Sequence, residues 1–316
     1  MDIILEQILI LSIMTVVGVI AYKLKAINKE NANGLVKVII KITLPLLIFT
    51  TFAGTELTDE ILINSPYVFA ASFFVVIVLF FLSKISAKAL KLDAENTALH
   101  NVHTMFGNIV FLGFPLLDAL LPGGEGLIYA TIFQLGHDTL MWTWGIYILN
   151  KGAEKKSSQN WKHLINPTTV AFVFGLILLI IKVKIPDLVF TPLSKIGHTT
   201  IYLSMIYVGS VLAAVKFKSL VSNLRSYVLS FNKLIFGALI LLGAFYILKL
   251  VGINVPQKAV IVSVMQAAMP CMIVISVLAQ EMGLNSKQAV ENIFVTSVLS
   301  IGSLPLMYWI VGQLFG

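Results

Sequence analysis

The amino-acid sequence predicts an all-α polytopic membrane protein with ten transmembrane helices, arranged as two inverted five-helix repeats with broken, crossing helices 4 and 9. Three observations support this prediction. Of the 316 residues, 58% are hydrophobic and only 12% are charged, and the mean hydropathy is +0.94, which excludes a soluble domain. The apolar residues form ten stretches of membrane-spanning length. Proline interrupts two of them, at Pro115 and Pro270, about half a chain length apart.

The first half of the chain contains five apolar stretches. Each approaches the roughly 20 residues that a helix needs to cross a bilayer. The first stretch is flanked by acidic rather than basic residues and lacks a small-residue cleavage site, so we expect a retained helix and not a signal peptide. The predicted spans are residues 4–22, 35–53, 67–83, 97–121 and 127–149.

The second half of the chain repeats this pattern, with a short sixth span. The predicted repeats are residues 1–150 and 166–316, and a polar cytoplasmic linker at residues 151–165 joins them. This linker is too short to be a domain. The predicted spans of the second half are residues 164–181, 190–214, 227–250, 259–279 and 289–314.

Basic residues are unevenly distributed between the two sides of the predicted membrane. The loops after spans 1, 3, 5, 7 and 9 hold 14 basic residues, whereas the opposite loops hold five. Basic loops stay in the cytoplasm, so we expect a multi-pass protein of the cell membrane with both termini outside. The formal charge of +7 then reflects orientation, and we predict no nucleic-acid partner.

Five spans per repeat is an odd number, so a second repeat of the same fold enters the membrane upside down. Spans 4 and 9 become symmetry partners, and these are the spans that proline interrupts. Pro115 clashes with the carbonyl four residues before it, while Gly107 and Gly113 permit unwinding. We therefore expect open backbone near Gly113 and near Pro270. Secondary transporters bind substrate at such openings.

Four short motifs carry a resemblance to a known family. Residues 106–115, FGNIVFLGFP, and residues 266–270, QAAMP, look like the two crossover motifs of the auxin efflux carrier family. Residues 296–305, TSVLSIGSLP, resemble its last helix, and Leu44-Pro45 resembles part of its second helix. The ten-span plan extends the resemblance over the whole chain.

The resemblance implies a transporter whose helices 4 and 9 cross at mid-membrane, with helices 3 to 5 and 8 to 10 moving against a scaffold. It places the chain with prokaryotic organic-acid permeases, whose substrates include malate and malonate, and it implies a homodimer. Asn108 matches the substrate-contacting asparagine of the family, and Gln134 matches a polar position of its binding site.

The physical chemistry of the two breaks favours an anionic substrate. The half-helices that begin near Pro115 and Pro270 would face each other with their N-termini, each carrying roughly half a positive charge, which suits one carboxylate. Cys271 would occupy the first turn of the second half-helix. Asn108 and Gln266 are neutral amides that can donate to a carboxylate. The alternative is that these amides hydrogen-bond neighbouring helices.

His137 and Asp138 form an ionisable pair near the middle of span 5. A carboxylate at mid-membrane is costly and is usually a proton relay or an ion site, so both residues are candidates for coupling transport to protons. The alternative is a structural Asp138 that hydrogen-bonds another helix.

Other polar residues in the spans favour structural interpretations. Lys37, Lys41 and Lys233 are expected to extend their ammonium groups toward the headgroups of the lipid bilayer. His100 and His103 share a helix face, but no acid or cysteine completes a metal site, and Cys271 is the single cysteine. We predict no metal and no cofactor.

Two other functional classes compete with an organic-anion carrier. A membrane-embedded enzyme is disfavoured because zinc-protease, diphosphate and serine-nucleophile motifs are absent from the sequence. A sodium-coupled or cation/proton-exchanging transporter of related fold remains the main alternative. Measured fluxes of organic acid and sodium distinguish these classes.

Overall fold

The computed structural model describes residues 2–56, 58–153, 167–213 and 223–315, and its secondary-structure elements there are all helical. Five helices are long and apolar enough to cross a membrane. The composition predicts this polytopic membrane architecture. The five helices are Gly34–Gly54, Asp59–Ala89, Asp187–Ala213, Leu224–Leu250 and Ser286–Phe315, and shorter apolar helices lie at Leu9–Lys23, Ile109–Leu120 and Pro167–Ile181.

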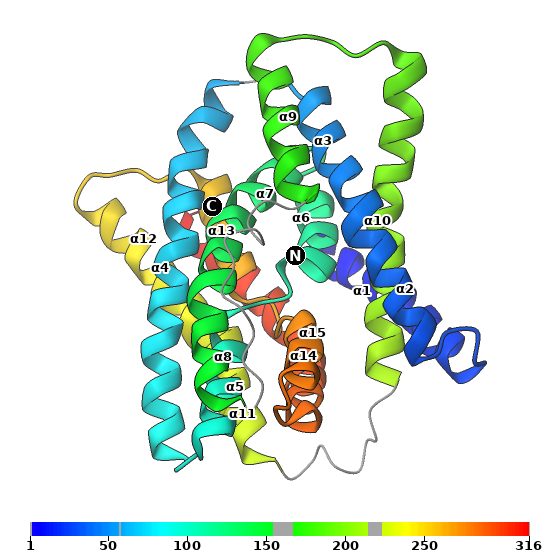
Figure 1. Cartoon of the computed structure of the whole chain (residues 1–316). Helices are drawn as coiled ribbons and strands as arrows, with labels where there is room; N and C mark the ends of the chain where they lie inside the picture. Colours follow the sequence, from blue (N-terminus) through cyan, green and yellow to red (C-terminus); the bar gives the residue numbers. More distant parts are fainter. Residues whose placement is uncertain (1, 57, 154–166, 214–222, 316) are drawn as a thin grey trace. The chain divides into compact units, whose positions relative to one another are not determined.

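The elements before the predicted linker run from α1 to α8 (Figure 1). Several α-helices continue directly into π-helical turns, denoted η. The elements are α1 (Asp2–Lys23), α2 (Lys29–Val38), η1 (Ile39–Thr43), α3 (Leu44–Gly54), α4 (Asp59–Ala89), α5 (Ala94–Met105), η2 (Ile109–Gly113), α6 (Phe114–Leu120), α7 (Glu125–Leu140), η3 (Met141–Gly145) and α8 (Ile146–Gly152).

The elements after the linker begin at α9. Most of the predicted linker, residues 154–165, lies outside the described residues. The elements are α9 (Pro167–Ile181), α10 (Asp187–Ala213), α11 (Leu224–Phe231), η6 (Asn232–Phe236), α12 (Gly237–Leu250), α13 (Gln257–Ala267), α14 (Val274–Glu281) and α15 (Ser286–Phe315).

The chain forms two compact units, and neither is a consecutive half of the sequence. Each unit takes segments from both predicted repeats, so the repeats at residues 1–150 and 166–316 are a different division and stay a prediction. The first unit comprises Met1–Ile63, Val110–Ile132 and Lys162–Ala214, and the second comprises Asn64–Ile109, Phe133–Trp161 and Val215–Gly316.

The first unit is built around α10, which packs against α1 and α3, while α9 packs against α3 (Figure 1). Glycine permits the closest approach between α1 and α10. Gly18 lies against the backbone carbonyl of Ile206, and Gly209 lies against that of Thr15. Small residues at such crossings allow membrane helices to bring their backbones together.

The backbone around Pro115 also belongs to the first unit, and it is helical. Gly113 has φ −67° and ψ −45°, and Pro115 lies in the first turn of α6. The prediction of open backbone near Gly113 is therefore wrong, and the break lies at residues 106–108, between α5 and η2. The π-helical turn η2 explains the difference, because its wider turn relieves the clash that proline causes in an α-helix.

The second unit contains α5, which is the first part of one interrupted helix, and both parts of the other, α13 and α14. α5 begins after Asp93, whose carboxylate accepts the N–H of Asn96 at 2.8 Å, and this backbone hydrogen bond lowers the pKa of Asp93. α5 ends at Met105 and packs against α8. α13 packs against α12 and α15, and the interval between α13 and α14 contains Pro270, where the sequence predicts a break.

We predict that Gly209→Ala destabilises the first unit, because the added Cβ would overlap the Thr15 carbonyl and force α10 away from α1. Gly243→Ala in α12 is the matched control, since a Cβ there meets nothing within 4 Å. Thermal unfolding of the purified protein in detergent should show a lower midpoint for Gly209→Ala only. Equal midpoints for the two variants would contradict close packing at this crossing.

Candidate functional site

The two helix breaks of the second unit meet in a short antiparallel bridge between Gly107 and Cys271. The Asn108 N–H donates to the Pro270 carbonyl at 2.7 Å, and the Met272 N–H donates to the Phe106 carbonyl at 3.1 Å. Buried backbone groups need such partners, because the apolar surroundings supply none. The two breaks therefore satisfy part of each other's backbone hydrogen bonding.

A side chain at Gly107 would be crowded by its surroundings at this bridge. A Cβ at this position would lie 3.1 Å from Nζ of Lys233 and 3.2 Å from Cβ of Met269. Pro270, opposite, has no N–H to donate but offers its carbonyl to Asn108. The motif residues thus fit the short backbone bridge between the two segments.

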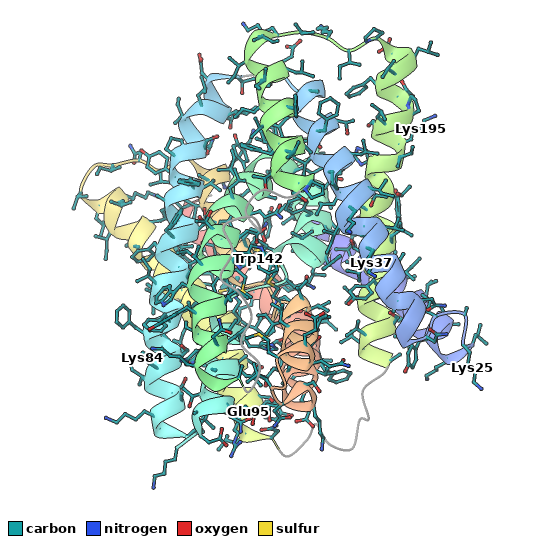
Figure 2. The ribbon with its side chains drawn as sticks, viewed as in Figure 1. Lys25, Lys37, Lys84, Glu95, Trp142 and Lys195 are labelled. Atoms are coloured by element: carbon teal, nitrogen blue, oxygen red, sulfur yellow. The ribbon has the colours of Figure 1, made fainter. Side chains whose placement is uncertain are left out.

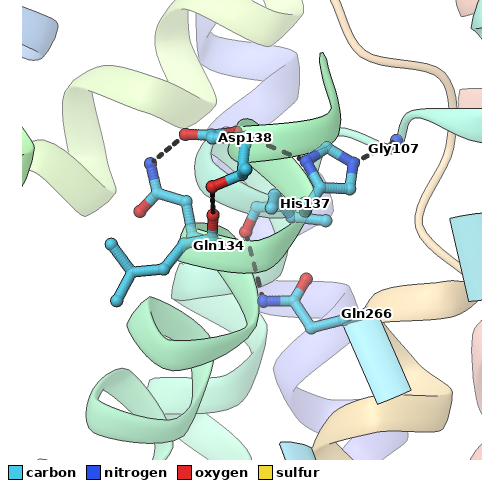
Figure 3. Close-up of polar contacts among 8 residues, drawn as sticks. Gly107, Gln134, His137, Asp138 and Gln266 are labelled. Atoms are coloured by element: carbon cyan, nitrogen blue, oxygen red, sulfur yellow. Dashed lines mark hydrogen bonds and ion pairs between the residues drawn. The ribbon is translucent and has the colours of Figure 1, made fainter. Parts of the chain in front are cut away.

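A chain of hydrogen bonds links the bridge to α7 (Figure 3). The Gly107 N–H donates to Nε2 of His137 at 3.2 Å. Because Nε2 accepts, the ring proton is on Nδ1, which lies 3.3 Å from Oδ1 of Asp138 and donates to it. The other carboxylate oxygen of Asp138 accepts from Nε2 of Gln134 at 3.0 Å. The predicted residues Gln134, His137 and Asp138 therefore act as one polar group at the bridge.

Burial differs sharply within this group. The His137 side chain is 2% exposed and that of Asp138 is 22% exposed. The Phe106 ring lies edge-on to the imidazole, with centroids 5.1 Å apart. The imidazole is thus fixed by Phe106, Gly107 and Asp138, while the carboxylate keeps partial access to its surroundings.

Three buried amide side chains near the bridge have unused hydrogen-bonding capacity. Asn108 and Gln266 are buried, and within the described part of the chain no hydrogen bond involves the Asn108 side chain. Nε2 of Gln266 lies 3.5 Å from the Ile109 carbonyl oxygen, a weak contact (Figure 3). The Oε1 atoms of Gln134 and Gln266 have no partner among the described residues. Buried polar atoms without partners require an explanation, and a ligand is one.

Cys271 lies at the bridge but not where the sequence predicts. α14 begins at Val274, so Cys271 is in the extended segment before the helix rather than in its first turn. Its N–H donates to Oγ1 of Thr296 at 3.1 Å, and its thiol donates to the His103 carbonyl at 3.4 Å. The side chain is fully buried. Because Cys271 takes part in the bridge, the helix begins only after it. The N–H of Cys271 is bonded to Thr296 and does not point freely at a ligand.

Gly113 and Pro115 are not part of this polar group, because they belong to the first unit. Their role as substrate-binding residues stays a prediction. The first unit also has a cavity of about 470 Å³, lined by residues such as Glu56, Lys184 and Phe190. None of the predicted site residues lines this cavity.

Lys233 is a residue of the site that the sequence interpretation missed. The prediction that it extends toward the headgroups is wrong, because the side chain is 2% exposed and its Nζ lies beside Gly107. It belongs to the π-helical turn η6. A lysine about two turns inside a predicted span was the available signal. Intramembrane lysines often mark a substrate path.

The described residues contain no group of three or more His, Cys, Asp or Glu side chains that could hold a metal ion. His100 is instead paired with Ser86, whose Oγ lies 2.7 Å from Nε2 of the ring. The site therefore offers amides, one carboxylate, one neutral imidazole and one ammonium group.

Known proteins resemble this chain over nearly its whole length. Residues 3–308 match a family described as "Membrane transport protein". A relative from Methanothermobacter thermautotrophicus, described as "Uncharacterized transporter", is 26% identical over 310 residues, which cover 95% of this chain and 96% of the relative. Both matches include the bridge and its polar group.

We predict that His137→Phe lowers the thermal unfolding midpoint, because it leaves the Gly107 N–H buried without an acceptor, a loss of about 1–3 kcal/mol. Asp138→Asn should lower the midpoint much less, since an amide oxygen can still accept from Nδ1 and the free Oε1 of Gln134 can accept from the new amide. Thermal unfolding in detergent measures both. A His137→Phe protein as stable as Asp138→Asn would show that the imidazole does not hold the bridge.

Proposed function

Because the chain belongs to the membrane transport protein family, we propose that it is a secondary transporter that moves a small organic carboxylate anion, such as malate or malonate, across the cell membrane. Substrate binds where the two broken helices meet, and it is transported by alternating access. The family and the relative are transport proteins rather than enzymes. The observation that supports the site is the backbone bridge between Gly107 and Cys271 with unfilled amides beside it.

The chemistry of the bridge suits a hydroxy or dicarboxylic acid. The amide groups of Asn108 and Gln266 can donate hydrogen bonds to a carboxylate, and the free Oε1 atoms of Gln134 and Gln266 can accept from a hydroxyl or from a carboxylic acid proton. Broken helices inside a membrane expose main-chain groups where substrate can reach them. A site that offers both donors and acceptors distinguishes such acids from hydrocarbons and from simple cations.

The proposed transporter has ten spans in two inverted repeats, with both termini outside and the loops rich in lysine in the cytoplasm. The interruption of one helix in each predicted repeat, at residues 106–108 and around Pro270, supports the pairing of spans 4 and 9. The family resemblance adds the organic-acid branch and a homodimer. The division into two units supports alternating access, since movement of one compact body against another is how such carriers work.

We predict that Asn108→Ala and Gln266→Ala each weaken substrate binding about tenfold to a hundredfold, the loss expected for one charge-assisted hydrogen bond. Binding of radiolabelled malate, malonate, citrate and lactate to purified protein measures this directly. Gln280→Ala is the matched control, because it removes an exposed amide of α14. If both buried-amide variants bind the best acid as tightly as wild type, these amides serve packing alone.

Asp138 favours a second candidate function, a sodium-coupled or cation/proton-exchanging transporter of related fold. It is a partly exposed acid in direct contact with the group that holds the bridge. In the organic-anion carrier this carboxylate couples uptake to protons. In the alternative it binds the transported cation itself.

We predict that Asp138→Asn retains uptake of the organic acid without a pH gradient but loses the acceleration that an inward proton gradient gives to the wild type. Uptake into proteoliposomes with imposed proton or sodium gradients tests this. Unchanged gradient dependence in Asp138→Asn would remove the coupling role. Sodium flux without acid flux in the wild type would instead favour the cation transporter.

A further inference from the structure

Lys233 is a buried cation beside the bridge, and its charge has no partner in the described part of the chain. Its side chain is 2% exposed. Among the described residues, no ion pair joins Lys233 to an acid. A buried ammonium group without an anion is strongly unfavourable, because little water is available to solvate it.

The geometry places this ammonium group at the point where the two breaks meet. Nζ lies 3.1 Å and Cε 3.2 Å from the position of a Cβ on Gly107, so a side chain there would crowd the ammonium group. Gly107 is itself one partner of the backbone bridge. The ammonium and the bridge therefore belong to one site.

The nearby ionisable groups do not supply the missing negative charge. His137 is neutral in its observed hydrogen bonding, with Nε2 accepting from Gly107 and Nδ1 donating to Asp138. Both oxygens of Asp138 are engaged, one by His137 and one by Gln134. The thiol of Cys271 donates to a backbone carbonyl. The positive charge of Lys233 is left for a group that is not part of the described residues.

We propose that Lys233 is the cation that binds the carboxylate of the transported acid and gives the site its preference for anions. This inference rests on the proposed function and changes its electrostatic basis, since an ammonium group rather than helix N-termini alone balances the substrate charge. Gly107 is the neighbouring position where a side chain would crowd the ammonium group. Asn108 and Gln266 then bind the remaining polar groups of the acid.

A structural role for Lys233 is the competing explanation. α5 and α13 both end near the bridge, at Met105 and Ala267, and helix C-termini carry partial negative charge that a cation stabilises. The two explanations differ in their effect on stability. A lysine that neutralises helix ends stabilises the protein even without substrate. A lysine whose only anionic partner is the substrate does not stabilise the protein without it.

The test compares Lys233→Met with Lys84→Met, which removes an exposed lysine on the surface of α4 (Figure 2). Binding of malate, malonate and their uncharged diamides to the purified proteins is measured together with thermal unfolding without ligand. We expect Lys233→Met to weaken binding of the acids by about 30-fold or more, the effect of removing one partner from a buried charge pair. Its preference for acid over diamide should disappear, while its unfolding midpoint stays equal to or above that of wild type.

Two further variants make the result specific. Lys233→Arg keeps the charge and should keep the preference for acid over diamide, although with reduced affinity. Gly107→Ala should weaken acid binding, because the new Cβ displaces the ammonium group. Lys84→Met should match wild type in every measurement.

The outcomes separate this inference from the proposed function. Wild-type protein that binds neither acid and shows no acid uptake overturns the proposed function and the Lys233 role with it. Wild-type protein that binds an acid, together with Lys233→Met that binds it equally well, overturns only the Lys233 role. A lower unfolding midpoint of Lys233→Met with acid preference retained assigns the lysine to the helix ends.

Discussion

The described structure of the second unit depends on the requirement that buried backbone N–H and carbonyl groups find partners in apolar surroundings. A continuous helix meets this requirement alone, but α5 and α13 each stop short. The N–H groups of Asn108 and Met272 are satisfied because they donate to carbonyls of the opposite break. The Gly107 N–H needs a side chain instead, which His137 provides. The polar group around the bridge therefore serves to satisfy buried backbone groups. Its acid and its imidazole are held at the bridge for this reason.

The sequence predicts some parts of this arrangement well, for physical reasons. Long apolar helices follow from the thickness of a bilayer, and a proline within a helix with small neighbours, as at Pro270, weakens it locally. The same reasoning fails at Gly113, because a π-helical turn accommodates Pro115 without opening the backbone. Pro305 similarly lies inside the continuous helix α15. Proline indicates where a helix is weakened, but neighbouring packing decides whether it opens.

The charged residues of the site were harder to predict. His137 and Asp138 are adjacent in sequence, so their partnership is visible without a structure. Lys233 lies beside Gly107 only because the fold brings η6 to the first break. Its position inside a predicted span was a signal, but the sequence does not show which residue it would meet. Within the described second unit, Asp138 contacts the neutral imidazole of His137, and Lys233 lies beside Gly107, whose N–H donates to the same ring. The net charge of these three side chains and any bound ligand changes when an anion or a proton binds beside them.

Within the described residues, the chain passes from one unit to the other inside helices, at three points. One crossing lies between Ile63 and Asn64 of α4, close to Pro66, and another lies between Ile109 and Val110, at the start of a π-helical turn. Proline and π-helical turns are the usual sites of kinks in helices. The third crossing, between Ile132 and Phe133, lies within regular α7. α7 therefore contributes residues to both units, and its C-terminal part, which carries His137 and Asp138, belongs to the second.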